Sequence, residues 1–409
     1  MAEWEPSGRQ REEQAVSSVA RRRTSAAVRW VAGGAAVFAL AAGCTSGESA
    51  GGGGTGSGPT AEAGPVTVEI TPAKGAESVS PRDRVVVTAK GGTLSDVTVS
   101  GGVSGSLDAA RTTWASKSQL DFGRTYTVTV QAADAGGAKT TSTSTFSTVD
   151  ATAQVFPAVS PLRGTTVGVG MPIRVYFDAP VTDKKAALAH MRVTTSKPTE
   201  GGWHWFSNTE VHWRPKTYWA SGTQVALDTD LYGVKLGDGV YGGAKANRHI
   251  EFAIGRSQIS VADARTHQFK VYVEGKLVKT FPASLGKEVK GRYTHSGAHV
   301  VTEKKRSMTM DSTTYGLALD AGGYRTKVEF ATRISNSGEF VHSAPWSVAQ
   351  QGRQNVSHGC INLSPANAAW FYGIANPGDV VEVRGTPVPL TSKDTDIPDW
   401  TIPWSEWGE

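Results

Sequence analysis

The sequence predicts a mainly β, multidomain protein, with two tandem β-sandwiches followed by a third, β-rich domain that has one main helix. The chain has 409 residues, which is too long for one compact core. From residue 65 onward, short runs of alternating Val, Thr and aromatic residues are separated by Gly-rich turns, the pattern of successive short strands. Residues 364–372 read as a helix, because Ser364 can cap it and Pro365 suits its first turn.

Residues 1–43 are predicted to be a signal peptide with a lipobox-like end. A basic cluster at 21–23 precedes an apolar run, 30–42, that is short for a membrane span. The run ends at Leu40-Ala41-Ala42-Gly43-Cys44, which resembles a bacterial lipobox with the leucine one position early. We therefore expect an exported protein of the cell envelope, lipid-anchored through Cys44 to the outer face of the cytoplasmic membrane. A plain signal peptide that happens to contain Cys44 is the alternative.

Residues 44–64 are expected to form a disordered Gly/Ser tether. After it, the strand pattern repeats with a period of about one hundred residues, the size of an immunoglobulin-like sandwich. The pairs that carry the period are Trp114 with Trp213, Gly123 with Gly222, and Phe146 with Phe252. We therefore expect immunoglobulin-like domains at 65–149 and 150–254. A stalk without chemistry is the preferred interpretation; a carbohydrate-stacking surface at 203–206 is the alternative.

The charge pattern gives no sign of a nucleic-acid partner. The formal net charge is +5, a weak excess, and no run of Lys and Arg follows the leader. A mild positive charge fits an anionic cell envelope.

A third domain is predicted at 255–384, followed by a Trp-rich tail, 385–409, packed on it. Residues 268–281 read as a hairpin with Glu274-Gly275 at the turn. Further strands are expected at 328–334, 340–341 and 380–383, around the helix at 364–372. The domain is thus mostly β, with the helix directly after a second cysteine, Cys360.

Cys360 is the only cysteine outside the leader region. An exported protein with one such cysteine cannot use it for an internal disulfide, so a reactive thiol becomes the candidate. A thiol nucleophile needs a nearby base to hold it as thiolate, and His342 precedes it by a short interval.

The pattern His342-Ser343-Ala344-Pro345-Trp346, followed by Ser357-His358-Gly359-Cys360 and Asn362, resembles the catalytic domain of L,D-transpeptidases, the YkuD family. The stretches 310–316, 323–326, 337–338 and 398–407 resemble the actinobacterial members, in which sandwich domains precede a YkuD-type catalytic domain. The resemblance implies a peptidoglycan L,D-transpeptidase with no cofactor and no metal. It would act on donor tetrapeptide and acceptor stems, release D-alanine and form 3→3 cross-links, and carbapenem β-lactams would inhibit it.

The resemblance also implies roles for individual residues. Cys360 is the nucleophile, His342 the base, and the main chain of Ser343 orients the imidazole. Gly359 would expose its amide and that of Cys360 to an oxyanion, while His358 shapes the loop or replaces His342 as base. Positions expected to contact substrate are Tyr324, Ser337, Gly338, Trp346, Ser357 and Asn362.

Three alternatives stay open from the sequence. His342, His358 and Cys360 could ligate zinc, although the spacing is tight. The same site could pass the acyl group to water, as an L,D-carboxypeptidase. The chain could also be a non-catalytic, wall-binding lipoprotein. The segment 291–300 departs from the family's proline-containing pattern, and its His295 and His299 are expected to be surface residues of a loop and a strand.

Overall fold

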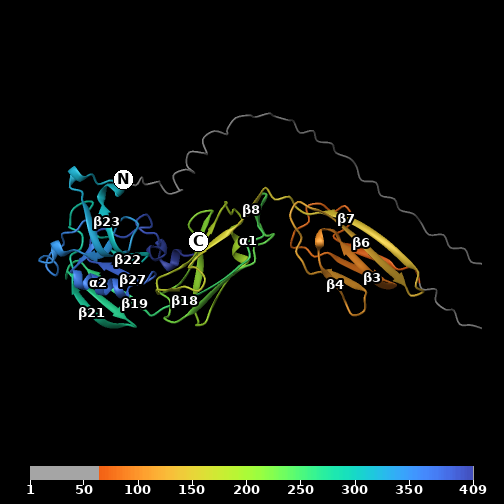
Figure 1. Ribbon diagram of the computed structural model, residues 1–409, viewed down its shortest axis with the longest axis horizontal. Helices are drawn as coiled ribbons and strands as arrows, with labels where there is room; N and C mark the ends of the chain where they lie inside the picture. The colour runs from red at the N-terminus through yellow and green to blue at the C-terminus, as the bar shows by residue number, and fades with distance from the viewer. Residues whose placement is uncertain (1–63, 409) are drawn as a thin grey trace, which may run out of the picture. The chain divides into compact units, whose positions relative to one another are not determined.

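A computed structural model describes residues 64–408, and its architecture confirms the mainly β prediction (Figure 1). The described part contains two α-helices, α1 (Lys184–Ala189) and α2 (Pro365–Ile374). Neither they nor any other helix in this part is long and apolar enough to cross a bilayer. The predicted leader, most of the tether and Cys44 lie outside the described residues.

The first β region consists of two antiparallel sheets, in the orange part of Figure 1. The first, in the order β1-β2-β5-β4, comprises β1 (Thr67–Thr71), β2 (Val86–Lys90), β5 (Thr113–Ser116) and β4 (Gly105–Leu107). The second comprises β3 (Gly92–Val99), β6 (Thr125–Asp134) and β7 (Lys139–Ser147), with the 3-10 helix η1 (Ser100–Gly102) after β3. Alternate side chains face the core, where Tyr126 stacks on Phe146 beside buried Trp114.

The second β region contains three sheets and α1. Their strand orders are β10-β18-β15-β12, β13-β14-β11-β9 and β16-β17-β8. The strands are β8 (Ala153–Val155), β9 (Pro157–Ser160), β10 (Thr166–Val167), β11 (Ile173–Phe177), β12 (Met191–Thr195), β13 (Gly201–Trp205), β14 (Glu210–Pro215), β15 (Gln224–Thr229), β16 (Lys235–Gly237), β17 (Val240–Gly242) and β18 (Arg248–Ile254). Positions paired by the sequence period are alike here. Trp213 and Phe252 are buried as Trp114 and Phe146 are, and Gly222 has a positive φ, as Gly123 has.

The third β region has two sheets, ordered β21-β20-β19-β27-β22 and β23-β24-β25-β26. The first contains β19 (Gln258–Asp263), β20 (Gln268–Val273), β21 (Lys276–Pro282), β22 (Gly297–Val300) and β27 (Val380–Arg384). The second contains β23 (Glu303–Asp311), β24 (Arg325–Arg333), β25 (Phe340–Ser343) and β26 (Ile361–Leu363). The 3-10 helices of this part are η2 (Ser312–Tyr315), η3 (Leu319–Ala321), η4 (Pro345–Ser347), η5 (Pro398–Thr401) and η6 (Trp404–Glu406).

Local sequence signals account for two of these elements. The β20–β21 hairpin turns at Glu274-Gly275, where φ is 49° and 71°, the two positive values that a tight hairpin turn requires. The side chain of Ser364 accepts a hydrogen bond from the Asn367 amide and caps α2, with Pro365 in its first turn. The α2 helix packs against β24 and β25, and Phe371 enters the core beside Phe269.

The tail, expected to pack on the catalytic domain, also contacts the second β region through its tryptophans. Trp400 donates to the Gly170 carbonyl and Trp407 to the Gly202 carbonyl. The Arg214 guanidinium lies over the rings of Trp400, Trp404 and Trp407. The tail also contacts the third region: η5 packs against β22, Leu390 donates to the Ser296 carbonyl, and the Asn336 amide donates to the Asp394 carbonyl. The cation–π contacts of Arg214 join residues that are far apart in the sequence, so they could not be predicted from it.

Candidate active site

Two adjacent parallel strands bring the predicted nucleophile and base to one face of a sheet. In the β25–β26 pair, His342 lies opposite Asn362 and Val341 opposite Ile361. Val341 and Ile361 point into the hydrophobic core. Because side chains alternate along a strand, His342, Asn362 and Cys360 point to the other face.

That face borders a pocket of about 310 Å³. Seven of the predicted site residues line it: Tyr324, His342, Trp346, Ser357, His358, Cys360 and Asn362. Residues to which the sequence assigned no role complete the wall: Met310, Thr326, Val328, Ser347, Gln350 and Val356. Met310 begins the stretch 310–316, which resembles the family, and that resemblance was the signal that could have placed Met310 at the site. The volume of this pocket and its mixed apolar and polar wall suit a short segment of a peptide.

The His342 imidazole is held as a neutral base. Its Nδ1 lies 2.8 Å from the carbonyl of Ser343, which can only accept a hydrogen bond, so Nδ1 carries the proton. Nε2 then has the lone pair. Burial lowers the pKa of His342 to about 4, with the Ser343 bond opposing the shift in part. The ring of Trp346, more than half exposed, lies 6.0 Å from the imidazole.

The Cys360 thiol is also held neutral. Burial raises its pKa to about 12; the carboxylate of Glu339 adds to the shift, whereas a Phe340 backbone bond and Arg333 oppose it. Sγ lies 3.6 Å from the Gly338 carbonyl, to which it donates. The expectation of a thiolate held by histidine is therefore wrong for this resting state, because burial disfavours both charged forms.

The loop before Cys360 is held by the Ser357 hydroxyl. Ser357 Oγ donates to the Cys360 carbonyl at 2.6 Å and accepts from the Gly359 amide at 3.1 Å. Gly359 has a φ of 121°, a backbone conformation that residues with a side chain rarely adopt. One prediction needs correction as a result, because the Gly359 amide is engaged inside the loop rather than facing the pocket. Ser357, expected to contact substrate, lines the pocket while its hydroxyl shapes the loop.

The remaining predicted residues lie around this centre in different ways. His358 Nε2 lies 3.2 Å from the Gly322 carbonyl, and its ring packs at 4.9 Å from that of Tyr324. The pKa of His358 is lowered by burial first and by Arg292 second. The Asn362 side chain donates to Ser347 Oγ through Nδ2. The buried Oδ1 of Asn362 makes no hydrogen bond. That acceptor borders the pocket and suits an amide N–H of a substrate.

The two residues of the Ser337-Gly338 pair have different surroundings. Gly338 faces the thiol, as described above, and borders a second cavity of about 370 Å³ whose wall shares Met310 and Tyr324 with the first. Ser337 lines neither cavity: its hydroxyl pairs with Ser335 and its amide with the Asp394 carbonyl. The polar groups of Ser337 are thus used within the chain, and its contact with substrate stays a prediction.

His295 and His299 are not the surface residues that the sequence suggested. His299 is fully buried in β22, and the side chain of His295 is only 23% exposed. Among residues 64–408, no group of three or more His, Cys, Asp or Glu side chains is placed to hold a metal ion.

Comparison with known proteins agrees with this fold. Residues 76–235 match a family described as a bacterial Ig domain, and residues 257–383 match the L,D-transpeptidase catalytic domain. L,D-transpeptidase 2 of Mycobacterium tuberculosis is 40% identical over 347 residues, which cover 84% of this chain and 83% of that protein. L,D-transpeptidase 5 of the same species is 37% identical, over 75% of this chain and 67% of its own.

Two solved structures are similar to part of the chain. A solved L,D-transpeptidase in complex with imipenem is 40% identical, covering 56% of this chain and 99% of that one, with a TM-score of 0.49. An L,D-transpeptidase from Mycobacterium smegmatis is 36% identical over the same shares, with a TM-score of 0.47.

A bacterial Ig domain that precedes an L,D-transpeptidase catalytic domain defines the class of this protein. By its relatives, this chain belongs to the L,D-transpeptidase family.

Proposed function

We propose that this chain is a peptidoglycan L,D-transpeptidase that forms 3→3 cross-links through an acyl-enzyme on Cys360. The observation that carries the proposal is the pairing of β25 with β26, which puts a buried thiol and a neutral imidazole on one face at a shared pocket. A neutral imidazole with Nδ1 bonded to a carbonyl is the form that can accept a proton.

In the first half-reaction, Cys360 Sγ attacks the carbonyl of the third residue of a donor tetrapeptide stem. The thiol proton passes to His342 Nε2. As the tetrahedral intermediate collapses, the same proton moves to the amine of the terminal D-alanine, the amide C–N bond breaks and a thioester forms. The resting neutral pair means that the thiolate forms only as the reaction proceeds, so no charge is buried beforehand.

In the second half-reaction, the side-chain amine of an acceptor stem attacks the thioester carbonyl. His342 takes the amine proton, an amide bond forms, the C–S bond breaks and the thiol regains its proton. If water takes the place of the amine, the same site is an L,D-carboxypeptidase. We assign the oxyanion of both steps to the Cys360 amide, because the Gly359 amide already donates to Ser357 Oγ.

The test is mass spectrometry of the full-length protein incubated with a disaccharide-tetrapeptide, beside Cys360→Ala. Loss of D-alanine with a 3→3 dimer, both absent in the variant, supports the transpeptidase. Loss of D-alanine without a dimer, even with acceptor in excess, assigns the carboxypeptidase. No Cys360-dependent change with tetrapeptide or pentapeptide stems refutes both enzymes and favours a wall-binding protein.

Carbapenems are proposed to acylate Cys360, because a strained lactam carbonyl is an electrophile for the same thiol. Opening of the lactam C–N bond would leave a thioester and add the full mass of the drug. Intact-mass measurement of the protein and of Cys360→Ala after incubation with imipenem checks this, with the adduct expected only on the former.

Export and lipid anchoring through Cys44 are also proposed, on the leader pattern alone. The two β regions would then act as spacers at 65–149 and 150–254 that set the reach of a catalytic domain at 255–384. Metabolic labelling with a radioactive fatty acid, compared between the chain and Cys44→Ser in a bacterial host, tests the anchor. Equal labelling of both proteins would refute it.

A further inference from the structure

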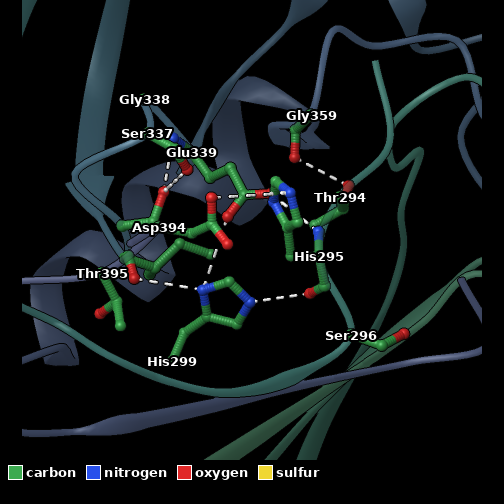
Figure 2. Close-up of polar contacts among 12 residues, drawn as sticks. Thr294, His295, Ser296, His299, Ser337, Gly338, Glu339, Gly359, Asp394 and Thr395 are labelled. Carbon is green, nitrogen blue, oxygen red and sulfur yellow. Dashed lines mark hydrogen bonds and ion pairs between the residues drawn. The ribbon is translucent and has the colours of Figure 1, made fainter. Parts of the chain in front are cut away.

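A buried polar cluster lies directly behind the nucleophile loop (Figure 2). It consists of His295, His299, Glu339 and Asp394. Glu339 is 3% exposed, and its Oε1 accepts both the backbone amide of His295 at 2.8 Å and His295 Nδ1 at 2.9 Å. Its Oε2 lies 3.6 Å from His299 Nδ1, and Asp394 Oδ1 lies 4.0 Å from His295 Nε2. The four side chains thus come from three separate segments.

Both ring nitrogens of His299 lie close to backbone carbonyls. Nε2 lies 2.8 Å from the His295 carbonyl, and Nδ1 lies 3.2 Å from the Ile334 carbonyl. Beside Nδ1 lies Glu339 Oε2, a buried oxygen that makes no hydrogen bond of its own. Burying a carboxylate oxygen without a hydrogen bond costs free energy.

The cluster is connected to the nucleophile by two short routes. Glu339 directly follows Gly338, whose carbonyl accepts from Cys360 Sγ. Thr294 directly precedes His295, and its hydroxyl donates to the Gly359 carbonyl at 2.7 Å while it accepts from the Gly286 amide at 2.9 Å. A Cβ placed on Gly359 would lie only 3.6 Å from Glu339 Cγ, so the carboxylate stem also packs against the loop.

We propose that this cluster positions the nucleophile, with Glu339 fixing the Gly338 carbonyl on one side of Cys360 and Thr294 fixing Gly359 on the other. The inference rests on the proposed role of Cys360. Glu339 is a positioning residue in this scheme, since it contacts neither the substrate nor the reacting atoms. Its charge also acts on the thiol, because Glu339, unlike either histidine, is among the groups that raise the pKa of Cys360.

The test compares Glu339→Gln, which removes the charge and keeps the size, with Asp399→Asn. Asp399 is the matched control, because it is a fully buried carboxylate that is also bonded to a buried histidine, His212, but lies outside the pocket. Two rates are measured on the full-length proteins at pH 8: alkylation of the Cys360 peptide by iodoacetamide, and release of D-alanine from the disaccharide-tetrapeptide.

For Glu339→Gln we expect the two rates to move in opposite directions. Alkylation should become about threefold faster or more, because the charge that opposes the thiolate is gone. Release of D-alanine should become about tenfold slower, because the thiol is no longer held in place. Per folded molecule, Asp399→Asn should alter neither rate. If Glu339→Gln behaves like Asp399→Asn, the cluster is purely structural and the proposal is overturned.

A second variant covers the case in which Glu339→Gln does not fold. Thr294→Val keeps the shape, leaves the ionic groups in place and removes the bond to Gly359. Slower release of D-alanine from this variant supports the proposal, and a wild-type rate refutes it. Failure of the proposed function has a different signature: the wild type and Cys360→Ala would both release no D-alanine, while the alkylation comparison would still report whether Glu339 acts on the thiol.

Discussion

His342 in the active site and His212 in the second β region are both buried, yet the protein holds them in opposite charge states. The neighbour of His342 is a neutral carbonyl, and burial lowers its pKa to about 4. His212 lies between two carboxylates, with Nδ1 2.9 Å from Asp399 and Nε2 2.9 Å from Glu210. Burial opposes its charge most strongly, but the bonds to Asp399 and Glu210 together outweigh it and raise the pKa.

The difference teaches that the partner, rather than burial itself, decides what a buried histidine does. A histidine opposite a carbonyl stays neutral and can take a proton from a thiol. A histidine between carboxylates stays charged and binds segments together, here β14 with η5 of the C-terminal tail. Catalysis and attachment thus use the same side chain with different neighbours.

The largest effect is expected for His342→Gln. Release of D-alanine should fall by about 10²–10⁴-fold, the usual contribution of a general base. The urea midpoint should change little, since no charged partner is left unpaired. His358→Gln, measured in parallel, should cause a smaller loss. A larger loss in His358→Gln would assign the base to His358 and break the comparison.

Asp399→Asn should have the largest effect on stability. Removal of one partner from a buried ion pair costs about 3 kcal/mol, because His212 is left with a poorly compensated charge. Urea denaturation followed by tryptophan fluorescence should report the loss, since the tail carries three tryptophans around Arg214. Glu210→Gln should cost less, because the Glu210 side chain is 33% exposed. Equal costs would show that burial of the carboxylate does not matter.

The pH dependence of stability gives a third test. Because the pKa of His212 is raised in the fold, its contribution is complete below the ordinary value of 6.5 and is lost as the pH rises through the folded-state pKa. The urea midpoint of the wild type should therefore fall more between pH 6.5 and 9 than that of Asp399→Asn. His249 and His295, whose pKa values are also raised, titrate in both proteins and cancel. Parallel curves would contradict a charged His212.

The smallest effect concerns a buried carboxylate that lacks a histidine partner. Burial raises the pKa of Asp379 to about 7, against a backbone bond from Asn376 and the charges of Arg256 and Lys304. Its ionisation therefore costs stability as the pH rises above 3.8, and the cost is complete above about 7. Asp379→Asn should stabilise the fold by about 1 kcal/mol at pH 8 and by less at pH 5. A lower Tm at pH 8 would show that the carboxylate is paired after all.

Much of the fold could be predicted because its signals are local. The β20–β21 turn is set by two adjacent residues that accept positive φ, and the start of α2 by Ser364 and Pro365. The chemistry of Cys360 and His342 could be inferred from a short motif, and both residues lie at one pocket. The hydrogen bonds of Ser357 and Ser337 within the chain could not be predicted, because their partners are known only once the loop is folded.

The sequence by itself determined the strand-rich architecture, the helix behind the cysteine and the identity of the thiol and imidazole, since these depend on neighbours in the chain and on intrinsic reactivity. Only the tertiary structure decided the charge states. His212 is charged because Asp399, 187 residues away, lies beside it. His342 is neutral because its buried position offers a carbonyl and no carboxylate. Burial and counter-charge depend on which distant segments pack together, and no local pattern in the sequence records that.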